Sequence, residues 1–201
     1  MESDIDVLLR EMEAYAEKYH VPILRSEERE LFERIVREAS PRRILEIGTG
    51  IGYSALLMLR SNPTANLISI ERDPECRAKA ERFISHAGKR YASRAMLLDG
   101  AAEKLLPELS PCFDFVFIDA AKSRYPFFWQ AIQPILTPRA VVVADNVLFR
   151  GLVDGEEWPK HSYRTMVLKL REYLRLVQAA PDFRTEIFPE GDGMAVSWRD
   201  A

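Results

Sequence analysis

Three oxygen-bearing side chains follow two short apolar runs in the second half of the chain. Asp119 ends the predicted strand FDFVFID, and Asp145 ends the predicted strand AVVVAD, with Asn146 next. Two carboxylates and an amide oxygen, without histidine or cysteine, are hard ligands that suit Mg²⁺ or another divalent cation. Such a cation keeps positions open for substrate oxygens and lowers the pKa of a bound hydroxyl. The pattern therefore predicts a metal centre that activates a hydroxyl oxygen.

Lys122 lies three residues after Asp119. It could accept the proton of that hydroxyl if its own pKa is depressed near the cation. Each residue also has an ordinary interpretation, because a lysine here is more often a surface residue and an aspartate after a strand can cap a helix. Asp145 and Asn146 could likewise form a turn. Their occurrence together, in a chain that also carries a cofactor loop, favours the metal site.

That cofactor loop lies in the stretch ILEIGTGIGYSALLM, which begins at Ile44. Its glycines, Gly48, Gly50 and Gly52, would let the backbone approach a ligand closely between a strand and a helix. A dinucleotide fingerprint would place the last glycine one position later, so NAD is the weaker alternative. Glu46 can face the cationic amino group of a methionine moiety, whereas it would repel a pyrophosphate. The loop therefore favours S-adenosylmethionine (SAM).

Two later strand ends support the same donor. Glu71 ends the run NLISIE, where a carboxylate can accept hydrogen bonds from both ribose hydroxyls. Asp99, Gly100 and Ala101 follow the run RAMLL, and small residues there would let an adenine lie against the backbone. With acids at both strand ends, a glycine turn without a ligand becomes the minor alternative.

These residues require strands that end at one edge of a sheet. From Arg43 onward, short apolar runs alternate with helix-length amphipathic segments, which predicts a parallel sheet with crossover helices. The runs FRTEIF and MAVSW, joined by PEGDG, predict a terminal hairpin. The predicted fold class is α/β, a doubly wound seven-stranded sheet with an antiparallel C-terminal hairpin. Ligands bind such sheets at the carboxyl ends of the strands.

The length of 201 residues predicts a single domain covering 1–201. Two helices, at 2–19 and 26–39, form its N-terminal part over 1–40, and Ser26 is the expected N-cap of the second. The core covers 41–201 and contains a long amphipathic helix at about 160–179.

Composition narrows the class of protein. The apolar fraction of 47% and charged fraction of 29% are those of an ordinary globular chain, and a net charge of −3 gives no global attraction to phosphate. Cys76 and Cys112 are expected to be free thiols in a reducing compartment. The acidic N-terminus lacks the pattern of a signal peptide, and no stretch is apolar enough to span a bilayer. We expect a cytoplasmic protein without a membrane partner.

With these motifs together, nearly the whole chain resembles the metal-dependent O-methyltransferases of the catechol and caffeoyl-CoA type. The resemblance implies a Rossmann-like class I methyltransferase fold, a contact of Ser54 with the methionine end of SAM, and a base lysine and tyrosine at Lys122 and Tyr125. The candidate site residues are then Leu24, Glu46, Gly48, Ser54, Glu71, Gly100, Ala101 and Asp119 for SAM, Asp119, Asp145 and Asn146 for the metal, Lys122 and Asp119 for catalysis, and Tyr125 and Arg150 for the substrate.

Within this family, the stretches AYAEKYHVPIL, FIDAAKSRY, DNVLFRGLV and GDGMAVS are most similar to a bacterial subgroup that methylates 5-hydroxyuridine at the tRNA wobble position. In that subgroup the residue at Leu24 contacts the donor. A 5-hydroxyuracil ring carries its hydroxyl beside a carbonyl and can chelate a metal as a catechol does. Ala120 and Ala121 replace a histidine and tryptophan of catechol methyltransferases, which argues against small catechols as substrates.

A tRNA partner requires basic surface, which a local cluster could provide. The segment from Trp158 to Arg175 contains Lys160, Arg164, Lys169, Arg171 and Arg175, and Arg150 precedes it. The alternative is an amphipathic helix with a solvated basic face. The aromatic residues Tyr125, Phe127, Phe128 and Trp129 could stack a flipped base, although such spacing is more often that of a core, so only Tyr125 is expected near the site.

Three functional hypotheses remain. The first is O-methylation of tRNA, and the second is O-methylation of a small catechol or hydroxycinnamoyl compound by the same site. The third is a nucleotide-binding or RNA-binding domain without catalysis, against which the presence of Asp119, Lys122, Asp145 and Asn146 together speaks. The family resemblance also implies a homodimer.

Overall fold

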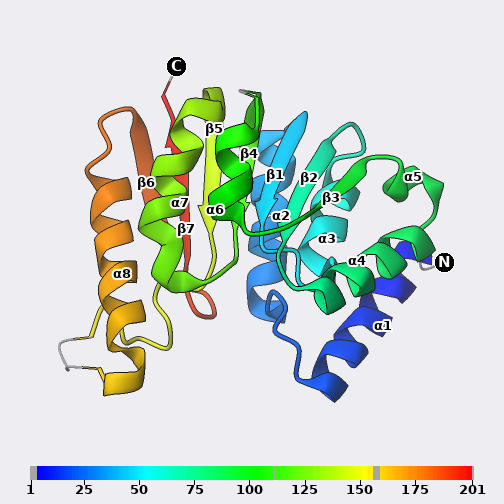
Figure 1. Ribbon diagram of the computed structural model, residues 1–201, viewed down its shortest axis with the longest axis horizontal. Helices are drawn as coiled ribbons and strands as arrows, with labels where there is room; N and C mark the ends of the chain where they lie inside the picture. The colour runs from blue at the N-terminus through cyan, green and yellow to red at the C-terminus, as the bar shows by residue number, and fades with distance from the viewer. Residues whose placement is uncertain (1–3, 111, 156–158, 201) are drawn as a thin grey trace. The chain divides into compact units, whose positions relative to one another are not determined.

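The computed structural model describes residues 4–110, 112–155 and 159–200. Its backbone contacts divide the chain into two compact units, Met1–Ala102 and Glu103–Ala201. Each unit is an α/β structure with its own strands and covering helices (Figure 1). The prediction of one domain over 1–201 stays a prediction.

The first unit is a three-stranded parallel sheet with helices. Its helices are α1 (Asp4–Tyr19), α2 (Ser26–Ala39), α3 (Tyr53–Ser61), α4 (Pro74–His86) and α5 (Lys89–Ala92), and its strands are β1 (Arg43–Ile47), β2 (Asn66–Glu71) and β3 (Ala95–Asp99). Both β1 and β3 pair in parallel with β2. The register sets Glu46 opposite Ser69 and Glu71 opposite Asp99. Parallel pairing brings the carboxyl ends of these strands to one edge, as predicted.

The predicted N-terminal helices are confirmed, although residues 2 and 3 lie outside the described residues. The expected N-cap is wrong by one residue. Ser26 is the first helical residue, and Arg25 stands before it with an extended backbone. Its N–H donates to the carboxylate of Glu28 at 3.2 Å, so a buried acid satisfies this helix end where a hydroxyl was expected.

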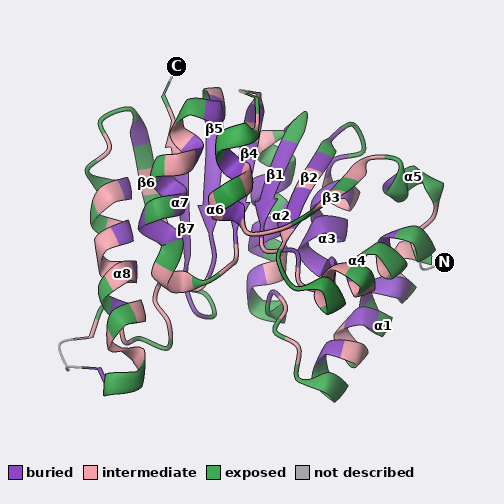
Figure 2. Ribbon diagram, viewed as in Figure 1, coloured by how far each residue is buried: buried purple, intermediate pink, exposed green. Residues whose placement is uncertain are grey.

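Partly buried ion pairs connect the three helices α1, α2 and α3. The guanidinium of Arg60 on α3 pairs with Asp6 on α1 and with Glu33 on α2. The apolar sides of these helices carry residues such as Met12 and Phe32, which are fully buried. In Figure 2 helix α1 carries both buried (purple) and exposed (green) residues, the amphipathic pattern that the sequence predicts for the N-terminus, whereas residues 53–59 of α3 are all buried.

The second unit has four strands and two long helices. Its strands are β4 (Phe113–Ile118), β5 (Leu136–Ala144), β6 (Phe183–Phe188) and β7 (Met194–Arg199); its helices are α7 (Tyr125–Ile132) and α8 (His161–Gln178), with the short α6 (Ala102–Leu105) at its start. Single turns of 3-10 helix are η1 (Leu106–Glu108), η2 (Lys122–Arg124) and η3 (Gln133–Ile135). β4 and β5 are parallel, whereas β7 runs antiparallel to both β5 and β6.

The seven strands with a terminal antiparallel hairpin confirm the predicted fold class. Three boundaries differ from expectation, because β4 and β5 end at Ile118 and Ala144, each one residue before the predicted acid, and β5 begins at Leu136, four residues before the predicted run. The early part of β5 contains Arg139 with φ 67, so the predicted apolar run is only its regular portion. Helix α8 packs against α7 and β6 (Figure 1).

Two predictions from composition can be compared with the structure. Cys76 and Cys112 are free, as expected. Within the described ranges, no helix combines the length and apolar character that a bilayer crossing requires.

Candidate functional site

The acid that ends β2 holds the glycine loop of the first unit. The N–H groups of Thr49 and Gly50 donate to Oε2 of Glu71 at 3.1 and 2.9 Å, and the N–H of Asp73 donates to Oε1 at 2.9 Å. The next loop glycine, Gly52, has φ 87, and a Cβ there would lie 3.2 Å from that of Ala80, so this turn needs glycine. The loop and the predicted ribose ligand thus form one hydrogen-bonded unit.

These bonds change the expectation for Glu71. A carboxylate offers about four acceptor positions. Three are occupied here by backbone N–H groups. Accepting both ribose hydroxyls would therefore require one of these N–H groups to be released, whereas one hydroxyl could bind without rearrangement.

Glu46 and Ser54 are brought together, as their predicted common role requires. Glu46 is fully buried, and its Oε1 accepts the hydroxyl of Ser54 at 2.5 Å. Its Oε2 accepts the hydroxyl of Ser69 on β2, also at 2.5 Å. Ser69 was missed in the sequence, where its signal is a single hydroxyl residue within the buried apolar strand NLISIE.

The other predicted donor contacts also belong to the first unit, except Asp119, which follows β4 in the second unit. Leu24 is buried in the wall of a cavity of about 550 Å³, which Tyr53 also lines. Gly48 donates its N–H to Ile70 at 3.0 Å, and Gly100 donates its N–H to the backbone carbonyl of Glu71 at 3.1 Å. Gly100, followed by Ala101, therefore lies at the end of β3 beside the predicted ribose ligand, which ends the paired strand β2. Binding of SAM by these residues stays a prediction.

The predicted metal ligands follow neighbouring strands of the second unit. Ile118 pairs with Ala144, so Asp119 and Asp145 are the first residues beyond two paired positions. The N–H of Asp145 donates to the carbonyl of Ile118 at 3.0 Å, which continues the ladder. Parallel pairing therefore places both acids at one sheet edge, as the sequence predicts.

The donor set fits a hard cation. The carboxylate of Asp145 is 2% exposed and accepts the N–H of Asn146 at 2.7 Å. Asn146 has φ 54, a left-handed conformation that asparagine tolerates better than most residues. No three His, Cys, Asp or Glu residues in the described part of the chain form a metal-ligating group. Asn146, which directly follows Asp145, is the amide that the sequence predicts as the third ligand.

Lys122 lies against Asp119, with its Nζ 2.6 Å from Oδ1. Burial disfavours the charged ammonium, but Tyr125, Asp119 and Asp145 outweigh this effect and raise the pKa of Lys122 above its usual value. The predicted base role assumed a depressed pKa. In this arrangement Lys122 holds its proton and orients Asp119, and it can accept another proton only after losing that one.

Tyr125 is near the predicted metal ligands and is engaged by the backbone of the strands that carry them. It is fully buried, and its hydroxyl lies 3.1 Å from the carbonyl of Ile118 and 2.9 Å from that of Asp145. Its ring meets Tyr173 edge-to-face at 5.4 Å. The expected substrate contact of Tyr125 stays a prediction, and in this conformation its hydroxyl is engaged by the ends of β4 and β5.

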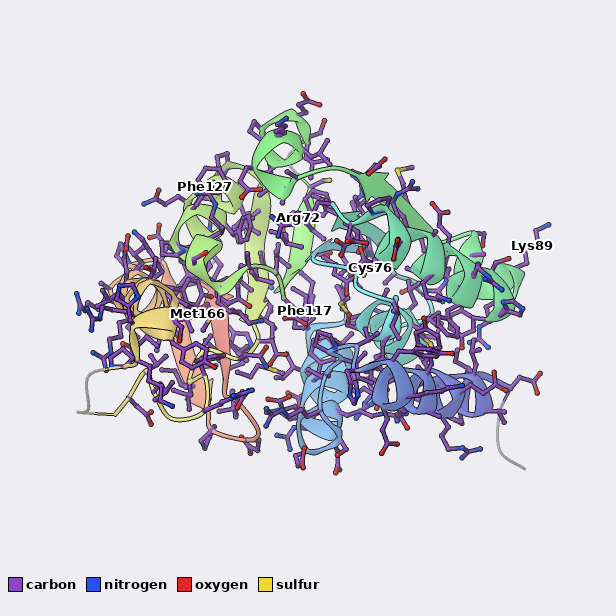
Figure 3. All side chains as sticks on the ribbon, turned by 60° about the horizontal axis from the view of Figure 1, so that its bottom comes forward. Arg72, Cys76, Lys89, Phe117, Phe127 and Met166 are labelled. Atoms are coloured by element: carbon purple, nitrogen blue, oxygen red, sulfur yellow. The ribbon has the colours of Figure 1, made fainter. Side chains whose placement is uncertain are left out.

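The neighbouring aromatic residues follow the same core pattern. Phe128 and Trp129 are buried, and Phe127 alone among the three is partly exposed, at 36%. Figure 3 labels Phe127 on α7 together with Phe117, which is fully buried on β4. Stacking of a base by the whole aromatic run is therefore excluded in this conformation.

The hairpin turn before β7 holds the segment that follows the metal ligands. Val147 donates its N–H to the carbonyl of Gly193 at 2.9 Å, and Leu148 and Phe149 donate theirs to the carbonyl of Asp192 at 2.9 and 3.2 Å. The N–H of Arg150 reaches the Asp192 carboxylate at 3.3 Å. The turn thus fixes the backbone of residues 147–150, which directly follow Asp145 and Asn146 in the chain.

We expect Gly193→Ala to lower the free energy of unfolding by about 2–4 kcal/mol. Gly193 has φ 83, and an added Cβ would collide with the side chain of Leu148. Gly50→Ala is the matched control, because Gly50 has φ 53 but open space around a Cβ, and it should cost only about 1 kcal/mol. Urea denaturation measures both values, and equal losses would contradict a tight contact between turn and loop.

The predicted basic cluster is smaller than the sequence indicates. Arg171 donates to the backbone carbonyls of Leu152, Val153 and Gly155, so it is a structural residue of the preceding loop. Lys169 pairs with Glu172. The exposed cations of the cluster are Lys160, Arg175 and Arg150.

The known proteins to which this chain is similar include several O-methyltransferases. Residues 2–200 match the family model for O-methyltransferases. A catechol O-methyltransferase of Niastella koreensis is 38% identical over 120 residues, covering 57% of this chain and 53% of that protein. The catechol O-methyltransferase of Bos taurus is 30% identical over 153 residues, covering 72% and 56%. These matches thus span little more than half the length of the relatives.

Two solved structures are similar over almost the whole chain. A Staphylococcus aureus protein, provisionally named as a caffeoyl-CoA O-methyltransferase, has a TM-score of 0.87 and 28% identity, covering 98% of this chain and 93% of that one. The O-methyltransferase TomG of Streptomyces achromogenes, solved with SAM, has a TM-score of 0.84 and 25% identity, covering 100% and 92%.

Proposed function

Because this chain belongs to the family of SAM-dependent O-methyltransferases, we propose that it transfers the methyl group of SAM to a hydroxyl oxygen of a substrate held near Asp119 and Asp145. The observation that carries the proposal is the placing of both acids directly beyond paired positions of β4 and β5. This arrangement supports an oxygen acceptor, because two carboxylates and an amide suit a cation that binds the oxygen atoms of a substrate.

SAM supplies an activated methyl group on its sulfonium. In our proposal, Glu46 and Ser54 bind its methionine end, Glu71 accepts a ribose hydroxyl, and Gly100 and Ala101 contact its adenine. The hydrogen bonds that Glu71 accepts from the glycine loop support this assignment, because they fix the backbone before the donor arrives. The SAM complex of TomG supports the choice of donor.

Asp119, Asp145 and Asn146 would hold Mg²⁺ in this proposal. The cation would supply Lewis acidity, which lowers the pKa of a neighbouring substrate hydroxyl. Tyr125 keeps the two strand ends in register through its bonds to Ile118 and Asp145. Lys122 orients Asp119 and, in this proposal, receives the proton of the substrate once its own proton has left.

We propose 5-hydroxyuridine at the tRNA wobble position as the acceptor. Its hydroxyl and adjacent carbonyl form a chelating pair, and the exposed Lys160, Arg175 and Arg150 offer cations to the phosphate backbone. Small Ala120 and Ala121 stand where catechol enzymes have bulky rings. A small phenolic acceptor is the second candidate, favoured by the catechol O-methyltransferase names of the relatives.

The test uses the purified chain with radiolabelled SAM and Mg²⁺. We expect label in tRNA that contains 5-hydroxyuridine, none in the same tRNA with unmodified uridine, and loss of transfer in EDTA. Full transfer in EDTA would refute the metal proposal. Efficient turnover of caffeate or catechol with inert tRNA would replace the first acceptor by the second.

A further inference from the structure

The hydroxyl groups of Thr49 and Ser69 form a hydrogen-bonded row that ends at the carboxylate of Glu46 in the first unit. No role has been assigned to these two hydroxyls so far. Ser69 is fully buried in the middle of β2 and sits opposite Glu46 in the register of β1 and β2. Its sequence neighbours Ile68 and Ile70 are apolar. Burying a hydroxyl at this position is costly unless it is hydrogen-bonded, so its partners indicate why a serine is there.

The hydrogen bonds of this row have a definite direction. A carboxylate accepts only, so the single proton of Ser69 points to Glu46 Oε2. Thr49 Oγ1 lies 2.5 Å from Ser69 Oγ, and with the serine proton committed, Thr49 must be the donor. Ser54 donates to the other oxygen of Glu46. The row therefore runs from Thr49 through Ser69 to Glu46, which also receives Ser54.

This row connects the glycine loop to the predicted methionine ligand. Thr49 belongs to the loop, and it is 3% exposed. Its backbone is held by Glu71, and its side chain is held through Ser69 by Glu46. Two acids from two strands thus fix one loop residue at both its backbone and its side chain.

We infer that Ser69 is a positioning residue for the donor: it orients Glu46 and the glycine loop so that the methionine end of SAM meets a preformed site. This inference rests on the proposed function. Without the hydroxyl, one oxygen of Glu46 and the hydroxyl of Thr49 lose their shared partner, and both groups can turn away. Donor binding must then restore the order that the unbound chain no longer has.

Calorimetric titration with S-adenosylhomocysteine, the demethylated donor, measures binding without turnover. We expect Ser69→Ala to raise its Kd about tenfold, which corresponds to the loss of one hydrogen bond to a charged group. Ser69→Thr keeps the hydroxyl and should bind within about threefold of the unchanged chain. Rescue by threonine distinguishes positioning by the hydroxyl from a general loss of packing.

Ser197→Ala is the matched control. Ser197 is also fully buried in a strand, β7, and its hydroxyl lies 2.8 Å from that of Thr185. This variant should leave the Kd unchanged although it loses a comparable bond. Unchanged binding by Ser69→Ala, or equal weakening by Ser197→Ala, would overturn the inference alone.

Two further outcomes are also decisive. If the unchanged chain does not bind S-adenosylhomocysteine, both the proposed function and this inference fail. If Ser69→Ala does not fold, Thr49→Val tests the same row from its other end, because valine keeps the shape of threonine without its hydroxyl. We then expect a severalfold rise in Kd, and unchanged binding would refute the inference.

Discussion

Asp145→Asn is expected to lower turnover by at least about a thousandfold while leaving the Kd for SAM within about twofold of the unchanged chain. The substitution keeps the size of the side chain and an oxygen that can accept the N–H of Asn146. It removes one of the two negative charges in the proposed metal set. Since Asp145, unlike Asp119, is not among the residues predicted to bind the donor, donor binding should not depend on this charge.

The measurement pairs steady-state kinetics with calorimetric titration of SAM. Asp182→Asn makes the same chemical change at an exposed residue of the second unit and should leave both values unchanged. Raising the Mg²⁺ concentration should restore part of the activity of Asp145→Asn, because a weakened site still binds at higher cation concentration. A parallel loss of SAM affinity would show that Asp145 serves the donor and that its assignment is wrong.

The sequence predicts the strand ends of this chain well, for a local reason. Acids at Asp119 and Asp145 follow runs of apolar residues, and in a parallel sheet all such runs end at one edge. The succession of strands and helices along the chain follows from the same alternation, and the terminal hairpin follows from its turn residues. Features that depend on neighbours in sequence were therefore within reach of the sequence alone.

Features that depend on register were not. Ser69 meets Glu46 across 23 positions of sequence, and only the pairing of β1 with β2 sets them opposite each other. In the sequence, Arg171 resembles any cation on the exposed face of a helix. Only the fold shows that it donates hydrogen bonds to the loop carbonyls of Leu152 and Val153. The burial of Tyr125 likewise follows from packing against Tyr173, 48 residues later, which no local pattern specifies.

The charge state of Lys122 is a third feature that the sequence alone does not predict. Its spacing from Asp119 permits both a base and an ion pair, and the spacing is identical for both. The balance between burial, which lowers the pKa, and the neighbouring groups, which raise it, depends on the distances in the folded chain. The sequence identifies the residue but not its protonation.

Glu71→Gln is expected to raise the Kd for S-adenosylhomocysteine by about thirtyfold or more, because it weakens two functions at once. The neutral amide is a poorer acceptor for the N–H groups of Thr49 and Gly50, which it must keep in place. It also offers the ribose a weaker partner than a carboxylate. Glu75→Gln, on the first turn of α4 and exposed, should leave the Kd unchanged.

Analogues of the ligand separate these two functions. In the unchanged chain, removing the 2′- or the 3′-hydroxyl of S-adenosylhomocysteine should weaken binding wherever Glu71 accepts that hydroxyl. In Glu71→Gln the same analogue should lose much less, since the pair interaction is already impaired. Three acceptor positions of Glu71 are filled by backbone N–H groups, so a loss from both analogues would mean that the loop releases one of them on binding. Equal losses in the variant and in the unchanged chain would instead assign Glu71 to the loop alone.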